Sequence, residues 1–446
     1  MNTPSLPHTT HTPQKYTGPS AAEVLAQRKQ FLNPGIFLYY NAPIMLVEGK
    51  GQYLWDDQGR RYLDGIGGIV TVSVGHCHPH VIAAANRQNA TLQHSTTLYL
   101  HPNVGAFAEQ LAAKLPGELK VCYFVNSGSE ATDLALLMAR AYTGNYDVIA
   151  LRNGYHGGNA SGMAVTGQST WKYNVPHSFG VHHAIAPYPY RGPYGYGDAE
   201  AGRKYADDVK SLIDYATPGK VAAFIAESIQ GVGGFVEFPQ AYLQHTYAHI
   251  RATGGLCIAD EVQTGFGRTG THFWGFEEHG VIPDIVTMAK GIGNGCPLAA
   301  VVTTSKIAQS LVGKVHFNTF GGNPVASAIG TAVLEVIEQE RLQENSLKIG
   351  GQIKAGLERL KAKYSIIGDV RGKGLLIGIE MVKDRTTKEP AKAECAAVLE
   401  HTRAMGLLIG RGGLWGQTIR LAPPMCITPA DADFILEVFD AAFAKL

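Results

Sequence analysis

The chain has 446 residues, 45% of them hydrophobic, and 38 Lys and Arg residues stand against 37 Asp and Glu. This length and hydrophobic content exclude a small binding module and a chain dominated by disorder, because such a chain can bury a large core. The net charge of +1, without a block of like charges, speaks against nucleic acid or a membrane surface as a partner. We therefore expect a small-molecule ligand.

The six cysteines are scattered singly, without a CxxC or a metal-finger spacing. This usage favours a reducing compartment, and we expect a cytoplasmic protein. Residues 1–20 contain one Lys and no Arg or apolar core, so they fit neither a secretory signal nor an Arg-rich transit peptide. We predict a disordered tail there. The longest uncharged stretch, between Asp64 and Arg87, contains several His and Gly residues and is a poor candidate for a membrane span.

The next segments predict a two-part organisation. Residues 21–75 carry a two-strand pattern and should pack with a smaller domain, whereas 76–330 should form the large domain. Short apolar runs alternate with helical patterns in that domain, which is typical of an α/β fold with a largely parallel sheet. Five runs predict its strands: 121–125, 147–151, 221–227, 255–260 and 284–289.

Residues 331–446 show a different sequence pattern, which predicts a smaller α+β domain. A long run with helical spacing, from 325 to 360, should lead out of the large domain. Residues 374–382 and 418–427 are expected to form antiparallel strands. Thr428, Pro429 and Asp431 then form the pattern of an N-cap, a first-position proline and an acid at the third position, which predicts a final helix.

Two charged residues end buried runs of the predicted sheet, where ligands of open α/β sheets bind. Asp260 follows LCIA, and a carboxylate there must be paired or hydrogen-bonded. Lys290 follows IVTMA, where burial favours the free amine that attacks a carbonyl to form a Schiff base. Taken singly, each also fits an ordinary residue at a strand end.

Other strand ends supply complementary chemistry. Ser127 to Ser129 follow the run 121–125 and open a helix, which suits a phosphate cradle or a plain N-cap. Tyr155 follows the next run and could stack on a flat ring or belong to the core. A phosphate site, a ring face, a carboxylate for a ring nitrogen and a Schiff-base lysine are together what pyridoxal phosphate requires.

From about Leu38 to the C-terminus, the sequence resembles the class III, fold-type I pyridoxal-phosphate-dependent aminotransferases. The most specific stretch is CIADEVQTGFGRTGTHFWGFEEHGVIPDIVTMAKGIGNGCPLAA (257–300). NSGSEA, HGG (156–158), TFGGNP (319–324) and IRLAPP (419–424) support it in the same order along the chain. The resemblance implies a large domain with a mostly parallel seven-stranded sheet and a smaller α+β domain built from the N- and C-terminal segments.

The resemblance also implies roles for individual residues. It places Lys290 in a Schiff base with the cofactor, and the remaining cofactor contacts fall on Asp260 at the ring nitrogen, Gln263 near the ring hydroxyl, Gly128 and Ser129 at the phosphate, and Tyr155 on the ring. Thr319 is implied to reach the phosphate of a neighbouring subunit, which predicts a homodimer and leaves a pair of dimers open. Arg420 is implied to bind a substrate carboxylate with its planar fork. Glu227 matches a residue that some members pair with that arginine.

Within the class, residues 152–167 and 410–428 are most similar to members that move the amino group of alanine to glyoxylate and also act on β-alanine-type amines. GGIV (67–70) stands where relatives that accept bulky arylalkyl amines often carry an aromatic residue, which favours small substrates. The predicted reaction is a ping-pong transfer from L-alanine, β-alanine or β-aminoisobutyrate to glyoxylate or pyruvate. A phospho-lyase of small amino-alcohol phosphates, or another omega-amino acid aminotransferase, is the alternative.

Two further motifs suggest other classes of function. GFGRTG (265–270) has the spacing of a dinucleotide-binding loop, but no clean helix pattern follows it. HCHPH (76–80) resembles a metal cluster, yet its spacing across a proline is more typical of a turn and helix cap, and we expect no metal. A non-catalytic binding protein would have little reason to keep Lys290, Asp260 and Arg420 together.

Overall fold

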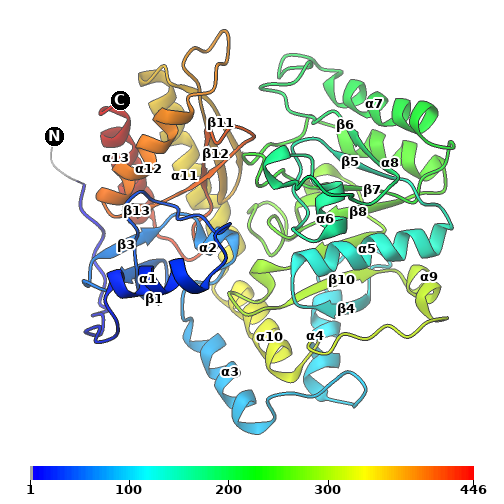
Figure 1. Cartoon of the computed structure of the whole chain (residues 1–446), viewed down its shortest axis with the longest axis horizontal. Coiled ribbons are helices and arrows are strands. Elements are labelled where there is room, and N and C mark those ends of the chain that lie inside the picture. The colour runs from blue at the N-terminus through cyan, green and yellow to red at the C-terminus, as the bar shows by residue number, and fades with distance from the viewer. Residues whose placement is uncertain (1–3) are drawn as a thin grey trace.

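A seven-stranded sheet lies at the centre of the larger half of the molecule (Figure 1). The computed structural model describes residues 4–446. In spatial order the strands are β4 (Val121–Val125), β10 (Ala299–Thr303), β9 (Ile285–Met288), β8 (Leu256–Asp260), β7 (Ala223–Glu227), β5 (Val148–Leu151) and β6 (Val181–Ala184). β10 pairs antiparallel with β4 and β9, whereas the other neighbouring strands pair in parallel. The predicted α/β fold with a mostly parallel seven-stranded sheet is confirmed.

The five predicted runs correspond to β4, β5, β7, β8 and β9. The sequence prediction missed β6 and β10. β6 reads VHHA, and its two central histidines interrupt the apolar run. His182 is nonetheless tolerated at this edge of the sheet because its Nε2 lies 2.8 Å from Asp147 Oδ1.

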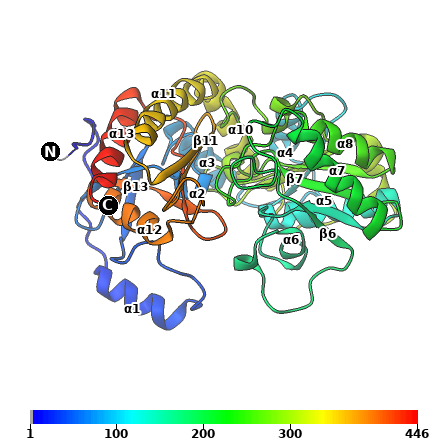
Figure 2. The same cartoon turned by 90° about the horizontal axis from the view of Figure 1, so that it is seen from above.

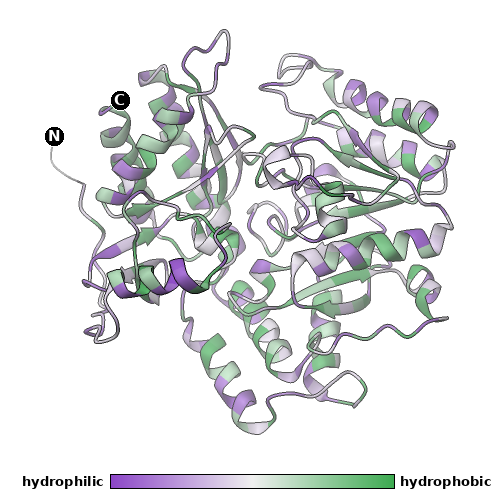
Figure 3. Cartoon of the chain, in the orientation of Figure 1, coloured by the Kyte–Doolittle hydropathy of each residue, from purple (hydrophilic) through white to green (hydrophobic). Residues whose placement is uncertain are grey.

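Helices cover both faces of this sheet (Figure 2). α5 (Gly128–Thr143) packs on one face, where alternate strand residues such as Val148 and Ala150 join its cluster of buried side chains. α7 (Ala201–Ala216) and α8 (Tyr242–Ala252) pack on the other face, against Ile149 and Leu151. Because both faces are covered, these strands are mostly apolar on both sides rather than alternating, with β6 at the edge as the exception. The hydropathy colouring shows the same contrast between apolar strands and the polar outer sides of the helices (Figure 3).

Two four-stranded sheets form the smaller half of the molecule. One joins β1 (Leu46–Lys50), β2 (Tyr53–Asp56), β3 (Arg61–Asp64) and β13 (Leu407–Leu408), and the other joins β11 (Ile367–Lys373), β12 (Leu376–Met381), β15 (Thr418–Leu421) and β14 (Gly410–Gly412). β13 pairs in parallel with β3, so the N- and C-terminal segments share a sheet. The helices of this half are α11 (Leu342–Lys363), α12 (Lys392–Ala404) and α13 (Pro429–Phe443). Thr428 and Asp431 form the predicted capping box of α13.

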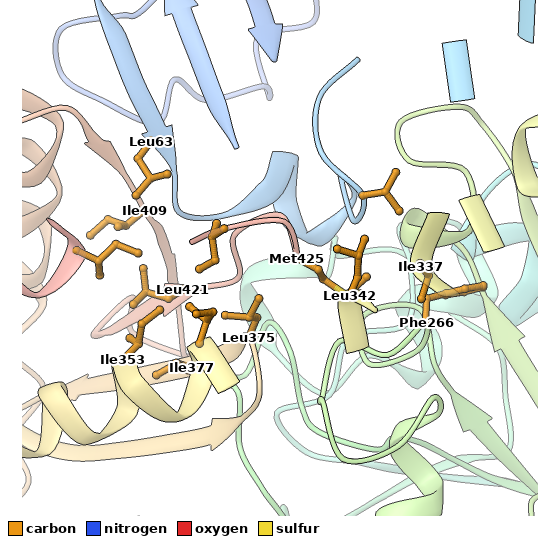
Figure 4. Packing of buried hydrophobic residues seen from close by; sticks show 14 of the residues in the cluster. Leu63, Phe266, Ile337, Leu342, Ile353, Leu375, Ile377, Ile409, Leu421 and Met425 are labelled. Atoms are coloured by element: carbon orange, nitrogen blue, oxygen red, sulfur yellow. The ribbon is translucent and has the colours of Figure 1, made fainter. Parts of the chain in front are cut away.

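A continuous apolar cluster joins these elements (Figure 4). Leu63 of β3 lies in it close to Ile409, and Leu421 and Met425 of the C-terminal segment belong to the same cluster. The cluster continues into the larger half at Phe266. The remaining helices are α1 (Ala21–Phe31), α2 (Gly67–Val70), α3 (Pro79–Thr91), α4 (Pro102–Ala112), α6 (Ala160–Val165), α9 (Ser305–Ala308), α10 (Pro324–Gln339) and the short 3-10 helices η1 (Ser169–Trp171), η2 (Gly275–His279), η3 (Lys290–Ile292) and η4 (Gln309–Leu311).

Two predictions along the chain differ from the structure. Residues 1–3 of the predicted disordered tail lie outside the described residues, but 4–20 run in an extended path over the N-terminal sheet, where Arg61 donates to Pro7 O over 2.7 Å and Glu48 accepts from Gln14 N over 2.8 Å. The long helical run after residue 324 is two helices, α10 and α11. They are separated at Arg341, whose φ of 52° turns the chain.

The domain boundaries at residues 20, 75 and 330 remain predictions. Within the described part of the chain, none of the helices is both long and apolar enough to cross a bilayer.

Candidate active site

The carboxyl ends of neighbouring strands converge on one cavity of about 550 Å³. Residues from the ends of β5, β7, β8 and β9 and from the start of α5 line it, and they are Gly128, Ser129, Tyr155, His156, Gly157, Glu227, Asp260, Val262, Gln263, Ala289 and Lys290. All of the predicted cofactor residues except Thr319 therefore lie around one space. This is the edge at which α/β sheets bind ligands.

Lys290 follows β9 after one residue, Ala289, and opens η3. Its φ of 51° is in the left-handed region, which a residue other than glycine seldom adopts outside a site that constrains it. Burial, together with the positive charge of Arg420, lowers the pKa of the Lys290 amine to about 8, although Asp260 and Glu227 oppose the shift. The side chain is thus poised to present a neutral amine to a carbonyl compound near neutral pH.

Asp260 ends β8, and its carboxylate is paired as its burial requires. His156 Nδ1 lies 2.6 Å from Asp260 Oδ2, and Val262 N donates to Oδ1 over 3.1 Å. Burial by itself lowers the pKa of His156, but the hydrogen bond and charge of Asp260 outweigh it, so that this pKa is raised. The pair fixes the orientation of a carboxylate that lines the cavity.

Glu227 ends β7 beside Asp260 in the parallel register. Its two carboxylate oxygens accept from Tyr155 N over 3.0 Å and from Gly231 N over 2.7 Å. Burial raises the pKa of Glu227 to about 7, and the neighbouring Asp260 adds to the shift whereas His156 and the two N–H donors oppose it. Glu227 therefore holds the backbone of two loops at the cavity wall.

The first turn of α5 forms one end of the cavity. The N–H groups of Gly128 and Ser129 belong to the first helical turn, which has no intrahelical acceptors for them. Gly157 closes the loop over this turn with a φ of 129°, and a Cβ there would lie 2.6 Å from Ser129 Oγ. The close approach requires glycine and leaves a cradle of backbone donors at a positive helix end, which suits a phosphate.

An aromatic pair flanks the same cavity. The Tyr155 ring lies 4.8 Å from the Trp171 ring, centroid to centroid, at an angle of 60°. Trp171 comes from η1 and was not among the predicted site residues. The pair holds the Tyr155 ring at the cavity wall.

Arg420 lies on β15 and is 4% exposed. Its Nη2 donates to Gln263 Oε1 over 2.7 Å, its guanidinium stands 4.6 Å above the Phe235 ring, and its buried Nε has no hydrogen-bond partner among the described residues. Burial lowers the pKa of Arg420. The described residues form no ion pair between Arg420 and Glu227, whose oxygens accept from backbone N–H groups, and the pairing of the two stays a prediction.

Thr319 is exposed and lies outside the cavity of its own chain. The loop that carries it is fixed through Asn318, whose Nδ2 donates to Glu130 Oε2 of α5 over 3.1 Å. Two large apolar side chains of this loop, Phe317 and Phe320, are exposed beside it.

Sequence reasoning did not assign His156 to the site, although HGG was noted as a motif. The signal was present, because Asp260 needed a buried partner and His156 followed a strand of the same sheet, β5, which is separated from β8 only by β7. The histidines of the HCHPH motif instead pair singly with carboxylates, His76 with Asp64, His78 with Glu340 and His80 with Glu335. His78 also provides the predicted cap of α3.

Comparison with known proteins identifies this arrangement. The class-III aminotransferase family matches residues 39–443. The chain belongs to that family. It is 53% identical over 441 residues to alanine–glyoxylate aminotransferase 2 homolog 2, mitochondrial, of Arabidopsis thaliana, which covers 99% of this chain and 91% of the relative. It is 46% identical over 462 residues to the human alanine–glyoxylate aminotransferase 2, mitochondrial, covering 99% and 90%.

Solved structures agree with the family assignment. A phospholyase from Arthrobacter in complex with phosphoethanolamine superposes on this aminotransferase with a TM-score of 0.89 at 35% identity, over 95% of this chain and 100% of the other. An amine transaminase from an uncultivated Pseudomonas species in a PLP-bound form gives 0.86 at 32%, over 93% and 98%. The predicted likeness to alanine–glyoxylate aminotransferase 2 is confirmed.

The chain is a pyridoxal-phosphate-dependent aminotransferase of fold type I, and its substrates are amino acids and keto acids. The cavity fits the cofactor by its own chemistry. Backbone donors meet a phosphate at one end, a buried carboxylate and an amine of lowered pKa face the middle, and Tyr155 provides an aromatic wall. When bound, the cofactor withdraws electrons from the carbon that carries the amino group.

Proposed function

We propose that this aminotransferase transfers the amino group of a small amino acid, L-alanine or β-alanine and β-aminoisobutyrate, to glyoxylate or pyruvate in two half-reactions at one site. The observation that carries this proposal is the buried Arg420 near Lys290. The amino donor and the keto acid each bear a carboxylate, and a guanidinium group binds a carboxylate with two hydrogen bonds. The names of the relatives support alanine and glyoxylate as the pair.

The cavity residues take the following parts in this proposal. Lys290 would hold the cofactor, and its freed amine would carry the proton to and from the substrate carbon. Asp260, oriented by His156, would accept a hydrogen bond from the ring nitrogen and keep it protonated. Gly128 and Ser129 would hold the phosphate, and Tyr155 would contact the ring.

Arg420 and Gln263 act together on the substrate. In the structure Gln263 Oε1 occupies one donor of Arg420, and Arg420 Nε has no partner among the residues described. A substrate carboxylate replaces that amide oxygen and uses both edges of the guanidinium. Gln263 is then released toward the cofactor, in the direction of the ring hydroxyl contact predicted for it. The exchange suits a ping-pong reaction, because amino donor and keto acid present the same group in turn.

The small and aliphatic residues of the segment 67–70 favour small substrates. Residues 67–70 form a left-handed turn, with φ of 58°, 58°, 65° and 60°. Val70 of this turn packs with Phe235, the ring below Arg420. An aliphatic turn in this place offers no aromatic face on which an arylalkyl amine would stack.

The deciding experiment incubates the purified enzyme, loaded with pyridoxal phosphate, with L-alanine and glyoxylate and measures pyruvate and glycine. β-Alanine and β-aminoisobutyrate replace alanine, and pyruvate replaces glyoxylate, in parallel reactions. The competing function is favoured by the likeness to the phospholyase from Arthrobacter. Release of inorganic phosphate from phosphoethanolamine without any keto acid, and no amino transfer from alanine, would overturn the proposed transamination.

We also propose that the enzyme is a homodimer in which Thr319 completes the phosphate site of the partner. Exposed Thr319 supports this, as do the exposed apolar side chains of Phe317 and Phe320 on the same loop and of Leu98, Tyr99 and Leu100 elsewhere in the chain. Sedimentation of the active enzyme as a dimer is the expected result, and full activity in a monomer contradicts it. A pair of dimers would appear in the same experiment as twice that mass.

We retain a cytoplasmic location as a proposal, based on the six scattered cysteines. The names of the Arabidopsis and human relatives include the word mitochondrial. Immunodetection of the native protein in fractionated cells decides between the two compartments.

A further inference from the structure

A second, larger cavity of about 1030 Å³ lies beside the active site. Its walls come from three separate segments of the chain, together with Val232 and two residues of α12; the lining residues of these segments are 37–39, Gln168, Thr170, Trp171, 411–416, Lys392 and Leu399. We call it the outer cavity. None of the cofactor or substrate residues discussed above lines it. Trp171, whose ring contacts Tyr155, does line it.

The outer cavity shares three walls with the active site. Trp171 lines the outer cavity, and its ring contacts Tyr155, which lines the inner one. Gly412 lies against Arg420, because a Cβ on Gly412 would stand 2.5 Å from Arg420 Cδ. Val232 lies in the same loop as Gly231, the residue that donates to Glu227. Residues that line the outer cavity therefore contact or adjoin residues of the active site at these three places.

Two cations line the outer cavity without a carboxylate partner. Arg411 and Lys392 take part in none of the ion pairs formed by the described residues. The guanidinium of Arg411 is held over the turn 413–416, where a Cβ on Gly416 would lie 3.3 Å from its Nε.

The acidic residues on the adjoining helix α12 do not neutralise these cations by direct contact. Glu394 follows Lys392 by two positions, which places it on another side of the helix. Glu400 already accepts from Asn41 N over 2.7 Å and pairs with Arg403. The outer cavity thus combines two cations that pair with no carboxylate in residues 4–446 with the aromatic side chains Phe37, Tyr39, Trp171 and Trp415.

We propose that the outer cavity receives the far end of an amino donor, or of its keto acid, when that end carries a carboxylate. The inference rests on the proposed function, in which the near carboxylate of the same molecule lies on Arg420. The aliphatic chain of such a substrate passes between the Tyr155–Trp171 pair and Gly412, and the distal carboxylate meets Arg411 and Lys392. The enzyme would then accept amino dicarboxylates as well as alanine.

The test compares two donors of equal chain length, L-2-aminoadipate and the neutral L-norleucine, in kcat/KM with glyoxylate. We expect the wild-type enzyme to prefer L-2-aminoadipate. Arg411→Gln and Lys392→Gln should each lower the ratio of the two values by about two- to fivefold, the range of an exposed charge pair. Lys348→Gln, a matched change of an exposed lysine on α11, should leave that ratio as it is.

Binding without turnover gives a second readout. A series of straight-chain dicarboxylates (succinate, glutarate, adipate and pimelate) is titrated calorimetrically into the loaded enzyme, with hexanoate as the neutral-ended control. Tighter binding of one dicarboxylate than of hexanoate, competitive with alanine and weakened in both variants, supports the proposal. A dicarboxylate that binds without competing with alanine marks an independent anion site and overturns it.

Equal donor ratios in the wild type and in both variants would also overturn the proposal. Lys392 is exposed, so its variant keeps the test valid if Arg411→Gln fails to fold. If the wild type is inactive with alanine and every other donor, the proposed function fails, and the calorimetric series still decides whether the outer cavity binds a carboxylate.

Discussion

Glu380 on β12 is the centre of a buried ionic network at the junction of the two halves of the molecule. It accepts from Arg371 over 2.7 Å and from Arg191 over 2.5 Å, and its side chain is fully buried. Tyr188, in the same loop of the larger half as Arg191, donates over 2.7 Å. Replacing Glu380 by Gln keeps the shape of the side chain but leaves both guanidinium groups without their shared anion.

The size of the effect follows from the pKa of this carboxyl. Burial by itself raises the pKa of Glu380, but Arg371, Arg191 and the hydrogen bonds to its carboxylate outweigh burial and lower it to about 2, from an ordinary value of 4.5. At 1.36 kcal/mol per pH unit this corresponds to about 3 kcal/mol of stabilisation near neutral pH. Breaking a buried pair by removal of one partner costs roughly 3–5 kcal/mol, which agrees. For a chain of this length, the thermal midpoint should fall by about 3 °C.

The pH dependence has a defined sign. The pKa of Glu380 is lower in the folded state than in the unfolded state, so its stabilisation is complete above about 4.5 and is lost as the pH falls toward about 2. The difference in unfolding free energy between wild type and Glu380→Gln should therefore be constant from neutral pH down to about 5 and become smaller below it.

Urea unfolding of the loaded enzyme, followed by fluorescence at several pH values, measures this difference. Glu109→Gln, the same change at an exposed position of α4, is the control and should have little effect. The reasoning would be refuted if Glu380→Gln and Glu109→Gln lost the same unfolding free energy. It would also be refuted if the difference between wild type and Glu380→Gln stayed constant down to a pH of about 3.

Three further predictions concern the active site. Borohydride reduction should fix the cofactor covalently to the peptide that contains Lys290 in the wild type, and mass spectrometry should find no such adduct in Lys290→Ala. In the wild-type apoenzyme, the rate of cofactor uptake should increase as the pH rises through about 8, because the Lys290 amine then becomes neutral. Asp260→Asn should lose about a hundredfold or more in kcat while its thermal midpoint changes little, and an equal kcat would contradict its role at the ring nitrogen. Arg420→Ala should lose roughly 2–5 kcal/mol of transition-state binding for the amino donor and the keto acid alike, seen in both kcat/KM values, while the absorbance of the bound cofactor stays the same.

The sequence predicts the active site better than it predicts the architecture around it. Asp260 and Lys290 are recognisable because a charged residue directly follows an apolar run, which is a local pattern. Their convergence in one cavity follows from the rule that parallel strands end at the same edge. β6 escaped prediction because His182 and His183 interrupt its apolar pattern, and the pairing of His182 with Asp147 becomes visible only in three dimensions.

The contacts of Arg420 and Glu380 depend on partners that are distant in the sequence. Arg420 contacts Gln263, 157 positions away, and Glu380 contacts Arg191, 189 positions away. No local pattern encodes such a pair, so the resemblance gives a role for Arg420 but not its partner. The break at Arg341 was also hidden, since its left-handed conformation lies between two sequences of good helical spacing.

The distribution of charge in the cavity bears on the proposed dimer. Asp260 and Glu227 face Lys290 at the middle of the cavity, and Arg420 stands nearby. At the phosphate end, the described lining residues are Gly128, Ser129 and Gly157, which bring hydrogen-bond donors but no side-chain cation. A phosphate held by a helix end alone gains a modest stabilisation, typically below about 2 kcal/mol from the dipole. A further donor from outside the chain, such as the hydroxyl of Thr319 from a second copy, would strengthen this end, and the proposed dimer would then bind the cofactor more tightly than a single chain.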